Sequence, residues 1–281
     1  MEHALSSPRS PRRPELPRGR VILGIVGRDF SITRSYRLAF VLDIVFVIVN
    51  LAVFFFISRT FKNATTADLH GAPSYFAFAA VGIALATVID TASAGLARRV
   101  RDEQLTGTLE VLLAHPVRIA ELAFGLAGFP FLFALIRTTV YLFVVALWAD
   151  IGLSVSKVAG LLAVLAASGV AFSALGVLLA AITLVVKRGD SIVGMLVFAM
   201  GFVSGAFFPI SVLPAWIEPI GRVMPTRFAF DGLRSAMFHG SGWAGDAGVL
   251  LLFGVFGIPL SLWLFRRALE IGRRRGSLGQ Y

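Results

Sequence analysis

Six long runs of apolar residues dominate the chain and are separated by shorter polar connections. They cover about 38–57, 75–97, 119–148, 158–186, 191–208 and 247–265. A helix needs about 20 mainly apolar residues to cross a hydrocarbon layer of about 30 Å, whereas a spanning strand would show alternation over about ten residues. The pattern therefore predicts an all-α membrane protein with six transmembrane helices.

The basic residues predict how these helices are oriented. With the N-terminus in the cytoplasm, nineteen of the 26 lysines and arginines lie on the cytoplasmic side and six lie outside. Cytoplasmic loops are enriched in such residues, so we expect a multi-pass protein of the plasma (inner) membrane with both termini in the cytoplasm. A basic rim facing anionic headgroups accounts for the net charge of +10, and no nucleic-acid partner is expected.

The composition changes at the two ends of the chain. Residues 1–18 include a Ser/Pro/Arg tract without an apolar core, which predicts a disordered basic tail. Between 19 and 37 apolar and basic residues interleave, which favours an amphipathic helix at the membrane interface, with a solvated linker as the alternative. Residues 266–281 are expected to form a basic cytoplasmic tail, so the transmembrane domain is expected to cover 19–265.

The composition also excludes several kinds of chemistry. The chain has no cysteine and its four histidines are scattered, so neither a disulfide nor a metal site is expected. The phosphate-binding loop G-x-x-x-x-G-K-[ST] is absent, because none of the lysines follows a glycine. The sequence therefore predicts a protein without catalytic residues, which cannot hydrolyse ATP by that route.

Three charged residues lie within the predicted spans, namely Asp43, Asp90 and Arg137. Charged residues at this depth pair with one another, face a cavity or mark a transport pathway. For the two aspartates, pairing with Arg34, Arg37 or Arg98 competes with contact to a substrate. For Arg137, the deepest of the three, a buried partner and an anionic substrate are both open. A secondary carrier that uses these three residues is the alternative function, although no inverted repeat is apparent.

The most informative polar stretch, at 98–117, reads RRVRDEQLTGTLEVLLAHPV. Its leucines recur at helical spacing along one face, and acidic residues occupy the opposite face. The pattern predicts a short cytoplasmic helix over about 102–114 that Pro116 ends. Because acidic groups are repelled by anionic headgroups, the polar face favours a protein partner over the membrane surface.

The same stretch resembles the E-x-x-x-G-T-L-E-x-L-L-x-x-P-V pattern of type 2 permeases of ATP-binding-cassette transporters. In that family this segment is the coupling helix, which docks on a separate ATPase subunit that binds ATP and magnesium. The resemblance implies that the contact residues are Glu103, Gly107, Thr108, Leu109 and Glu110. It also implies a non-catalytic membrane subunit with no cofactor of its own.

Four of the twelve prolines fall between 209 and 225, in a segment that stays apolar. Proline at this density prevents one continuous helix, so we expect a re-entrant pair of short helices that dips into the outer leaflet. An external loop with aromatic anchors is the alternative. The segment also resembles the late F-x-P and L-P-x-W block of the same permeases. That resemblance implies an outer gate formed by Phe207, Pro209, Leu213, Pro214 and Trp216.

The resemblance further implies an exporter that works as a dimer with a second copy or a paralogue. Gly201 and Gly205 stand four residues apart in the fifth predicted span, which would let another helix approach closely, within the subunit or across a dimer. A cavity with apolar walls and few charges favours a hydrophobic or amphipathic substrate of drug or lipid type, and a lipid-linked glycan stays open. Membrane lipids complete the expected partners.

Overall fold

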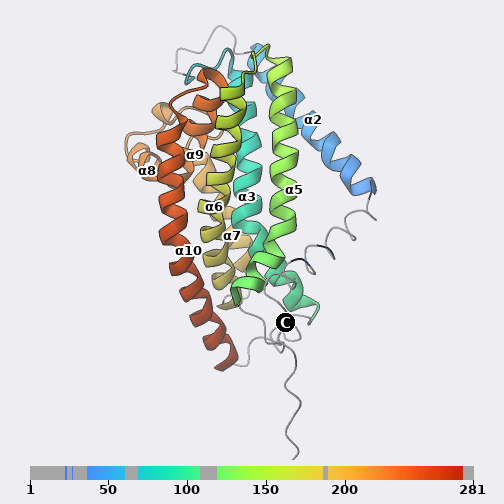
Figure 1. Ribbon diagram of the computed structural model, residues 1–281, viewed down its shortest axis with the longest axis vertical. Helices are drawn as coiled ribbons and strands as arrows, with labels where there is room; N and C mark the ends of the chain where they lie inside the picture. The colour runs from blue at the N-terminus through green and yellow to red at the C-terminus, as the bar shows by residue number, and fades with distance from the viewer. Residues whose placement is uncertain are drawn as a thin grey trace, which may run out of the picture.

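The computed structural model describes residues 23, 27, 37–60, 69–107, 119–185 and 189–274, and the regular elements within them are helical (Figure 1). Six long helices follow the six apolar runs. They are α2 (Arg37–Thr60), α3 (Tyr75–Leu105), α5 (Ile119–Trp148), α6 (Val155–Val185), α7 (Gly189–Val203) and α10 (Trp243–Arg274). Between α7 and α10 lie a 3₁₀ turn (Ile210–Val212), α8 (Glu218–Val223), α9 (Pro225–Arg234) and a π-helical turn (Ser235–His239).

Within the described ranges, four helices are long and apolar enough to cross a membrane. Their qualifying stretches are Tyr75–Glu103, Gly125–Trp148, Val155–Thr183 and Trp243–Glu270. The prediction of an all-α membrane protein is therefore confirmed for the described part of the chain. The count of six spans stays a prediction, because the apolar stretches that the structure describes in α2 and α7, Ile48–Thr60 and Ser191–Val203, are shorter than about 20 residues.

The fifth apolar run, expected to be helical through residue 208, stops being helical earlier. α7 ends at Val203, and Gly205 has a φ of +92°, in the left-handed region that favours glycine. The chain turns at this point instead of continuing the helix, so the expected boundary is wrong. Gly201 and Gly205 therefore do not lie on one continuous helix, and their role in a close helix contact or a dimer face stays a prediction.

The predicted cytoplasmic helix at 102–114 also differs from the structure. Residues 102–105 form the last turn of α3, which continues the second span without a break. Gly107 follows the helix end with a φ of +71°, so the interpretation of this glycine as a helix-interior residue is wrong. Thr108, Leu109 and Glu110 lie outside the described residues.

The two ends of the chain also lie largely outside the described residues. Of the interfacial helix expected at 19–37, Leu23, Gly27 and Arg37 are described, and the tail expected at 1–18 is not. At the other end α10 continues to Arg274, so the first part of the basic tail expected at 266–281 belongs to this helix.

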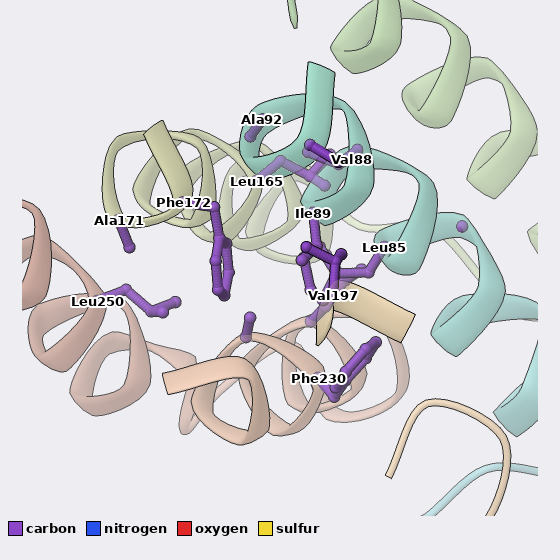
Figure 2. Close-up of a cluster of buried hydrophobic side chains, with 14 of the residues drawn as sticks. Leu85, Val88, Ile89, Ala92, Leu165, Ala171, Phe172, Val197, Phe230 and Leu250 are labelled. Carbon is purple, nitrogen blue, oxygen red and sulfur yellow. The ribbon is translucent and has the colours of Figure 1, made fainter. Parts of the chain in front are cut away.

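The hydrophobic core forms where α6 packs along both α3 and α10 (Figure 1). Figure 2 shows Leu85, Ile89, Phe172 and Leu250 among the buried side chains that meet there. Small residues allow the close packing. A Cβ atom on Gly176 of α6 would lie 2.2 Å from the carbonyl oxygen of Ala92 in α3, so only glycine fits at this crossing.

α2 is set apart from the bundle and tilts away from it toward its N-terminal end (Figure 1). Its other end is held by Phe55, whose ring centroid lies 5.7 Å from that of Phe76 and 5.4 Å from that of Trp148. Nearer its N-terminal end, Leu42 and Val45 are exposed. Exposed apolar side chains on a membrane helix contact lipid or another helix, so α2 presents a free packing surface.

Candidate functional site

A half-open groove of about 550 Å³ runs between α3, α5 and α7. Ile89, Val197 and Phe230, which Figure 2 shows in the core, form part of its wall. The groove brings together four residues that the sequence singled out for different reasons, namely Asp90, Arg137, Gly201 and Phe207. The fold therefore places residues from four separate segments around one space.

Polar groups gather at the end of the groove that lies nearer the C-terminal end of α3. Asp90 accepts hydrogen bonds from both terminal nitrogens of Arg98, at 2.7 and 3.3 Å, and both side chains are about half exposed. Of the three arginines considered as partners, Arg98 therefore pairs with Asp90, whereas a role of Asp90 in the transport pathway stays a prediction. On the same helix, the Thr87 hydroxyl donates to the Ala84 carbonyl at 2.7 Å, which leaves its oxygen able to accept a hydrogen bond.

Arg137 reaches the groove from α5, the helix opposite this polar face. Its neighbour Thr138 is buried, with its hydroxyl oxygen 3.5 Å from that of Thr87. Arg137 therefore lies level with the polar turns of α3. The side chain of Asp43, the third charged residue that the sequence singled out, lies outside the described part of α2.

Aromatic rings gather at the opposite, outer end. Phe207 stacks on Phe54 with ring centroids 6.4 Å apart and lies 6.3 Å from Phe198. Phe198 continues to Phe202 at 6.2 Å, and Phe202 meets Phe208 edge to face at 4.9 Å. These contacts form a continuous aromatic row that runs from α2 to Phe207, then along α7 and back to Phe208. Two members of the row, Phe198 and Phe207, line the groove.

The other predicted gate residues lie in the turns between α7 and α8. Pro209 is buried and precedes the 3₁₀ turn, whereas Trp216 is 75% exposed. Leu213 and Pro214 connect the 3₁₀ turn to the turn before α8, and the Ile217 amide donates to the Pro214 carbonyl at 2.9 Å. Phe207 is the member of this group that lines the groove, and insertion of the segment into the outer leaflet stays a prediction.

The segment 204–240, which we call the outer cap, is anchored by a residue whose importance the sequence did not reveal. Arg234 is 1% exposed, and its Nη2 atom donates to the carbonyl oxygens of Gly205 at 2.8 Å, Ala206 at 3.2 Å and Phe78 at 3.4 Å. Its guanidinium carbon also lies 3.5 Å from the centroid of the Phe78 ring. Burial lowers the pKa of Arg234, and the nearby Asp231 carboxylate opposes that shift.

A signal for this anchor was present in the apolar spacing of α9. Ala229, Phe230, Leu233 and Ala236 recur at helical spacing and are all buried. Arg234 follows Phe230 by four residues, so it falls on the same face. Arg234 is one of the six basic residues that the sequence pattern places outside the membrane, because a charged side chain by itself suggests exposure. Its position in the helical register of α9 instead indicates burial.

The outer cap has further contacts on both sides of this anchor. A Cβ atom on Gly82 of α3 would lie 1.8 Å from the Ala206 carbonyl oxygen and 2.8 Å from Nη2 of Arg234, so α3 approaches the cap as closely as a backbone allows. Ser204 and Thr226 form a buried hydroxyl pair. These contacts fix the turn that ends α7.

A charged cluster covers the outer side of the cap. The Nε atom of Arg227 donates to Asp231 at 3.0 Å, and Nε2 of His70 lies 3.8 Å from the other carboxylate oxygen of Asp231. His70 also stacks on Phe78 with ring centroids 6.4 Å apart. The connection before α3 is thereby tied to α9. Among the described residues, no group of three or more histidine, aspartate or glutamate side chains is placed to hold a metal ion.

Near the C-terminal end of α3, two predicted coupling residues are described. Glu103 is 9% exposed in the last turns of α3, whereas Gly107 is exposed and no atom lies within 4 Å of the position that its Cβ would take. None of the described residues therefore packs against Gly107, which directly follows the helix that forms one wall of the groove.

The comparison with known families agrees with these features. The family model described as ABC-2 type transporter matches residues 24–238, more than half of the chain. The matched region contains the groove, most of the outer cap and the segment 102–114. A search of curated proteins found no match. The chain therefore belongs to the ABC-2 type transporter family, the permease family that its sequence motifs resemble.

Proposed function

We propose that the chain is the membrane-spanning permease subunit of an exporter and moves a hydrophobic or amphipathic substrate, of drug or lipid type, through the groove between α3, α5 and α7. ATP and magnesium are bound by a separate ATPase subunit. The observation that carries this proposal is the groove itself, which is polar at one end and aromatic at the other. Its volume of about 550 Å³ falls within the range of about 300–1,000 Å³ that is typical of small-molecule sites.

α3 offers a direct route from the ATPase to the groove. This helix carries Asp90 at the groove and ends at Leu105, beside the segment that resembles a coupling helix. Asp90 and Leu105 are fifteen positions apart, which corresponds to about 22 Å along a continuous helix. A movement of the docking segment would therefore tilt α3 and shift the wall of the groove in the same step.

Export requires the outer end of the groove to open. The row of phenylalanines lies at that end, with Phe198 on α7 against Phe207 in the outer cap, and this contact supports the proposal that the row acts as a gate. Because Arg234 anchors the cap to Phe78 of α3, the contact that we expect to separate is the aromatic one between Phe198 of α7 and Phe207. We propose that α7 moves relative to the cap when the substrate leaves.

A second copy or a paralogue would cover the open side of the groove. α7 exposes Ile192, Met195, Phe198 and Phe202, and α2 exposes Leu42, Val45 and Val49. Both faces are apolar and belong to helices at the edge of the bundle. The proposed dimer lies in the plasma (inner) membrane with both termini of each subunit in the cytoplasm, as the distribution of basic residues favours.

The decisive experiment is gentle extraction of the tagged chain from its native membrane, followed by mass spectrometry and reconstitution. We expect a stoichiometric soluble subunit with a phosphate-binding loop, and we expect Glu110→Lys to release it by reversing a charge at the proposed docking site. The reconstituted complex should move a fluorescent amphipath with ATP. Transport without ATP that collapses with a proton gradient would contradict the proposal and favour a secondary carrier.

A further inference from the structure

A second cavity, which we call the side crevice, lies between α6 and α10 and is half open, with a volume of about 240 Å³. It shares no described lining residue with the groove, although both touch α7, where Met200 lines the crevice and Val197 lines the groove. Figure 2 shows Ala171 and Phe172, two residues of the crevice wall, at the side of the core nearer to α10, whereas Val197 lies nearer to α3. The side crevice is therefore a separate site.

The walls of the side crevice are apolar. Among the lining residues that the structure describes, Ser261 is the polar side chain, and its hydroxyl donates to the Ile258 carbonyl at 3.0 Å. Leu260, at the edge of the crevice, is 59% exposed. The volume lies below the range of about 300–1,000 Å³ that is typical of drug-sized ligands. The crevice therefore suits a slim apolar chain.

The tryptophans of α10 indicate where the crevice lies in the bilayer. Trp243 and Trp263 are twenty positions apart, or about 30 Å along the helix, which equals the thickness of the hydrocarbon layer. Tryptophan is enriched at both interfaces of a membrane, so the two residues mark its two faces. The part of α10 that lines the crevice runs from Phe253 to Leu264, and Phe253 lies about 15 Å from Trp263. The crevice therefore extends over one leaflet, as one lipid chain does.

A cation lies beside the crevice at the C-terminal end of α10. Arg267 follows Leu260 by seven residues and Leu264 by three, so it lies on the side of α10 that lines the crevice. Its guanidinium carbon lies 5.4 Å from the centroid of the Trp263 ring, and both side chains are exposed. The sequence from 266 to 274 has four arginines against one glutamate, so this end of the helix attracts anionic lipid headgroups.

We propose that the side crevice binds one acyl chain of an anionic phospholipid whose phosphate lies at Arg267. The apolar walls fit the chain, the length along α10 fits one leaflet, and the guanidinium donates charge-assisted hydrogen bonds to the phosphate. This site goes beyond the proposed function, because its ligand is a resident membrane lipid and not the transported substrate. Since Met200 of α7 is part of the wall, the bound chain also supports the helix that we propose to move.

The direct test places a fluorophore at the crevice and a quencher on the lipid. The chain contains no cysteine, so Leu260→Cys, at an exposed position, can carry a single bimane. The full chain is reconstituted in phosphatidylcholine vesicles with rising mole fractions of phosphatidylglycerol that has a doxyl group on its acyl chain. Phosphatidylcholine labelled at the same carbon is the comparison. We expect phosphatidylglycerol to reach half-maximal quenching at a mole fraction at least about fivefold lower.

A second bimane position distinguishes a site from general attraction to a basic surface. Val255 is 62% exposed and does not line the crevice. It precedes Leu264 by nine residues, or two and a half turns, so it lies on the opposite side of α10. The two labelled lipids should quench bimane at Val255→Cys equally.

The headgroup contact is tested in the Leu260→Cys background with two adjacent arginines. Arg266 and Arg267 are both exposed and carry the same charge, but Arg266 follows Leu264 by two residues and lies on a different side of the helix. Arg267→Gln should remove the preference of about fivefold for phosphatidylglycerol, whereas Arg266→Gln should change it by less than about twofold.

Three results would overturn the proposal. Equal quenching by the two lipids at Leu260→Cys would show that the crevice does not select an anionic lipid. A preference of the same size at Val255→Cys, or equal losses in the two glutamine variants, would show that the basic end of α10 attracts anionic lipid without a defined site. None of these measurements needs ATP or a second subunit, so their failure would leave the proposed permease function untouched.

Discussion

The Nη2 atom of Arg234 donates a hydrogen bond of 2.8 Å to the carbonyl oxygen of Gly205, twenty-nine residues earlier in the chain. Gly205 is the left-handed residue at which the chain turns after α7. The carbonyl groups at such a turn have lost the partners that a continuing helix would give them. Arg234 supplies donors to this carbonyl and to that of Ala206, which lines the groove, so one buried guanidinium stabilises the turn after α7.

Replacing Arg234 should therefore destabilise the fold. Arg234→Met keeps an apolar stem but leaves buried carbonyl groups without their donor, and we expect a loss of about 2–4 kcal/mol in the free energy of unfolding. Thermal unfolding of the detergent-solubilised protein, followed by fluorescence, would measure this. Arg222→Met is the matched control, because Arg222 is exposed and pairs with Glu218, a contact worth about 0–1 kcal/mol. Equal shifts in the two variants would show that Arg234 is not the anchor.

Gly82 should be intolerant of the smallest side chain. Its Cβ atom would lie 1.8 Å from the carbonyl oxygen of Ala206, which is a backbone atom, so α3 and the outer cap would have to separate. We expect Gly82→Ala to lower stability by about 1–3 kcal/mol, as overpacking does. Gly95→Ala on the same helix is the control. Its nearest atom would be Cγ2 of Thr91 at 3.8 Å, so the change should be neutral or stabilising by up to about 1 kcal/mol. The prediction fails if both variants unfold at the temperature of the original chain.

The elements that sequence predicts well here are those that depend on local patterning. Apolar runs of spanning length give α3, α5, α6 and α10, and the spacing of Asp90 and Arg98 on one helix leads to their ion pair. The end of α7 was missed because it depends on a contact with Arg234, which no local pattern encodes. The groove could not be predicted either, since its lining comes from α3, α5, α7 and α9. Single residues such as Arg137 were identified by their depth in the membrane, but their neighbours depend on how the helices pack.

Filling the groove should stop transport without disturbing the fold. Gly201 lines the groove and has no atom within 4 Å of the position that its Cβ would take, so Gly201→Leu introduces a side chain into open space. We expect ATP-driven transport of a fluorescent amphipath in proteoliposomes to fall at least about tenfold, with thermal stability unchanged, because the side chain displaces the substrate. Gly248→Leu on α10 is the control and should transport normally, since its Cβ also meets open space but lies away from the groove. Full transport by Gly201→Leu would mean that the substrate takes another route.

The aromatic row should act as the outer seal of the groove. Phe198 contacts both Phe202 and Phe207, so Phe198→Ala removes two links of the row at once. Phe198 is 64% exposed, so the truncation should cost less stability than the 3–5 kcal/mol that is typical of a buried phenylalanine. We expect a several-fold rise in the leak of a fluorescent amphipath from proteoliposomes without ATP, because the outer end would no longer be closed. Phe256→Ala is the matched control, since Phe256 is 73% exposed on α10 and does not line the groove. A leak that rises equally in both variants would point to a general disturbance of the bilayer, whereas a leak in neither would mean that another part of the outer cap forms the seal.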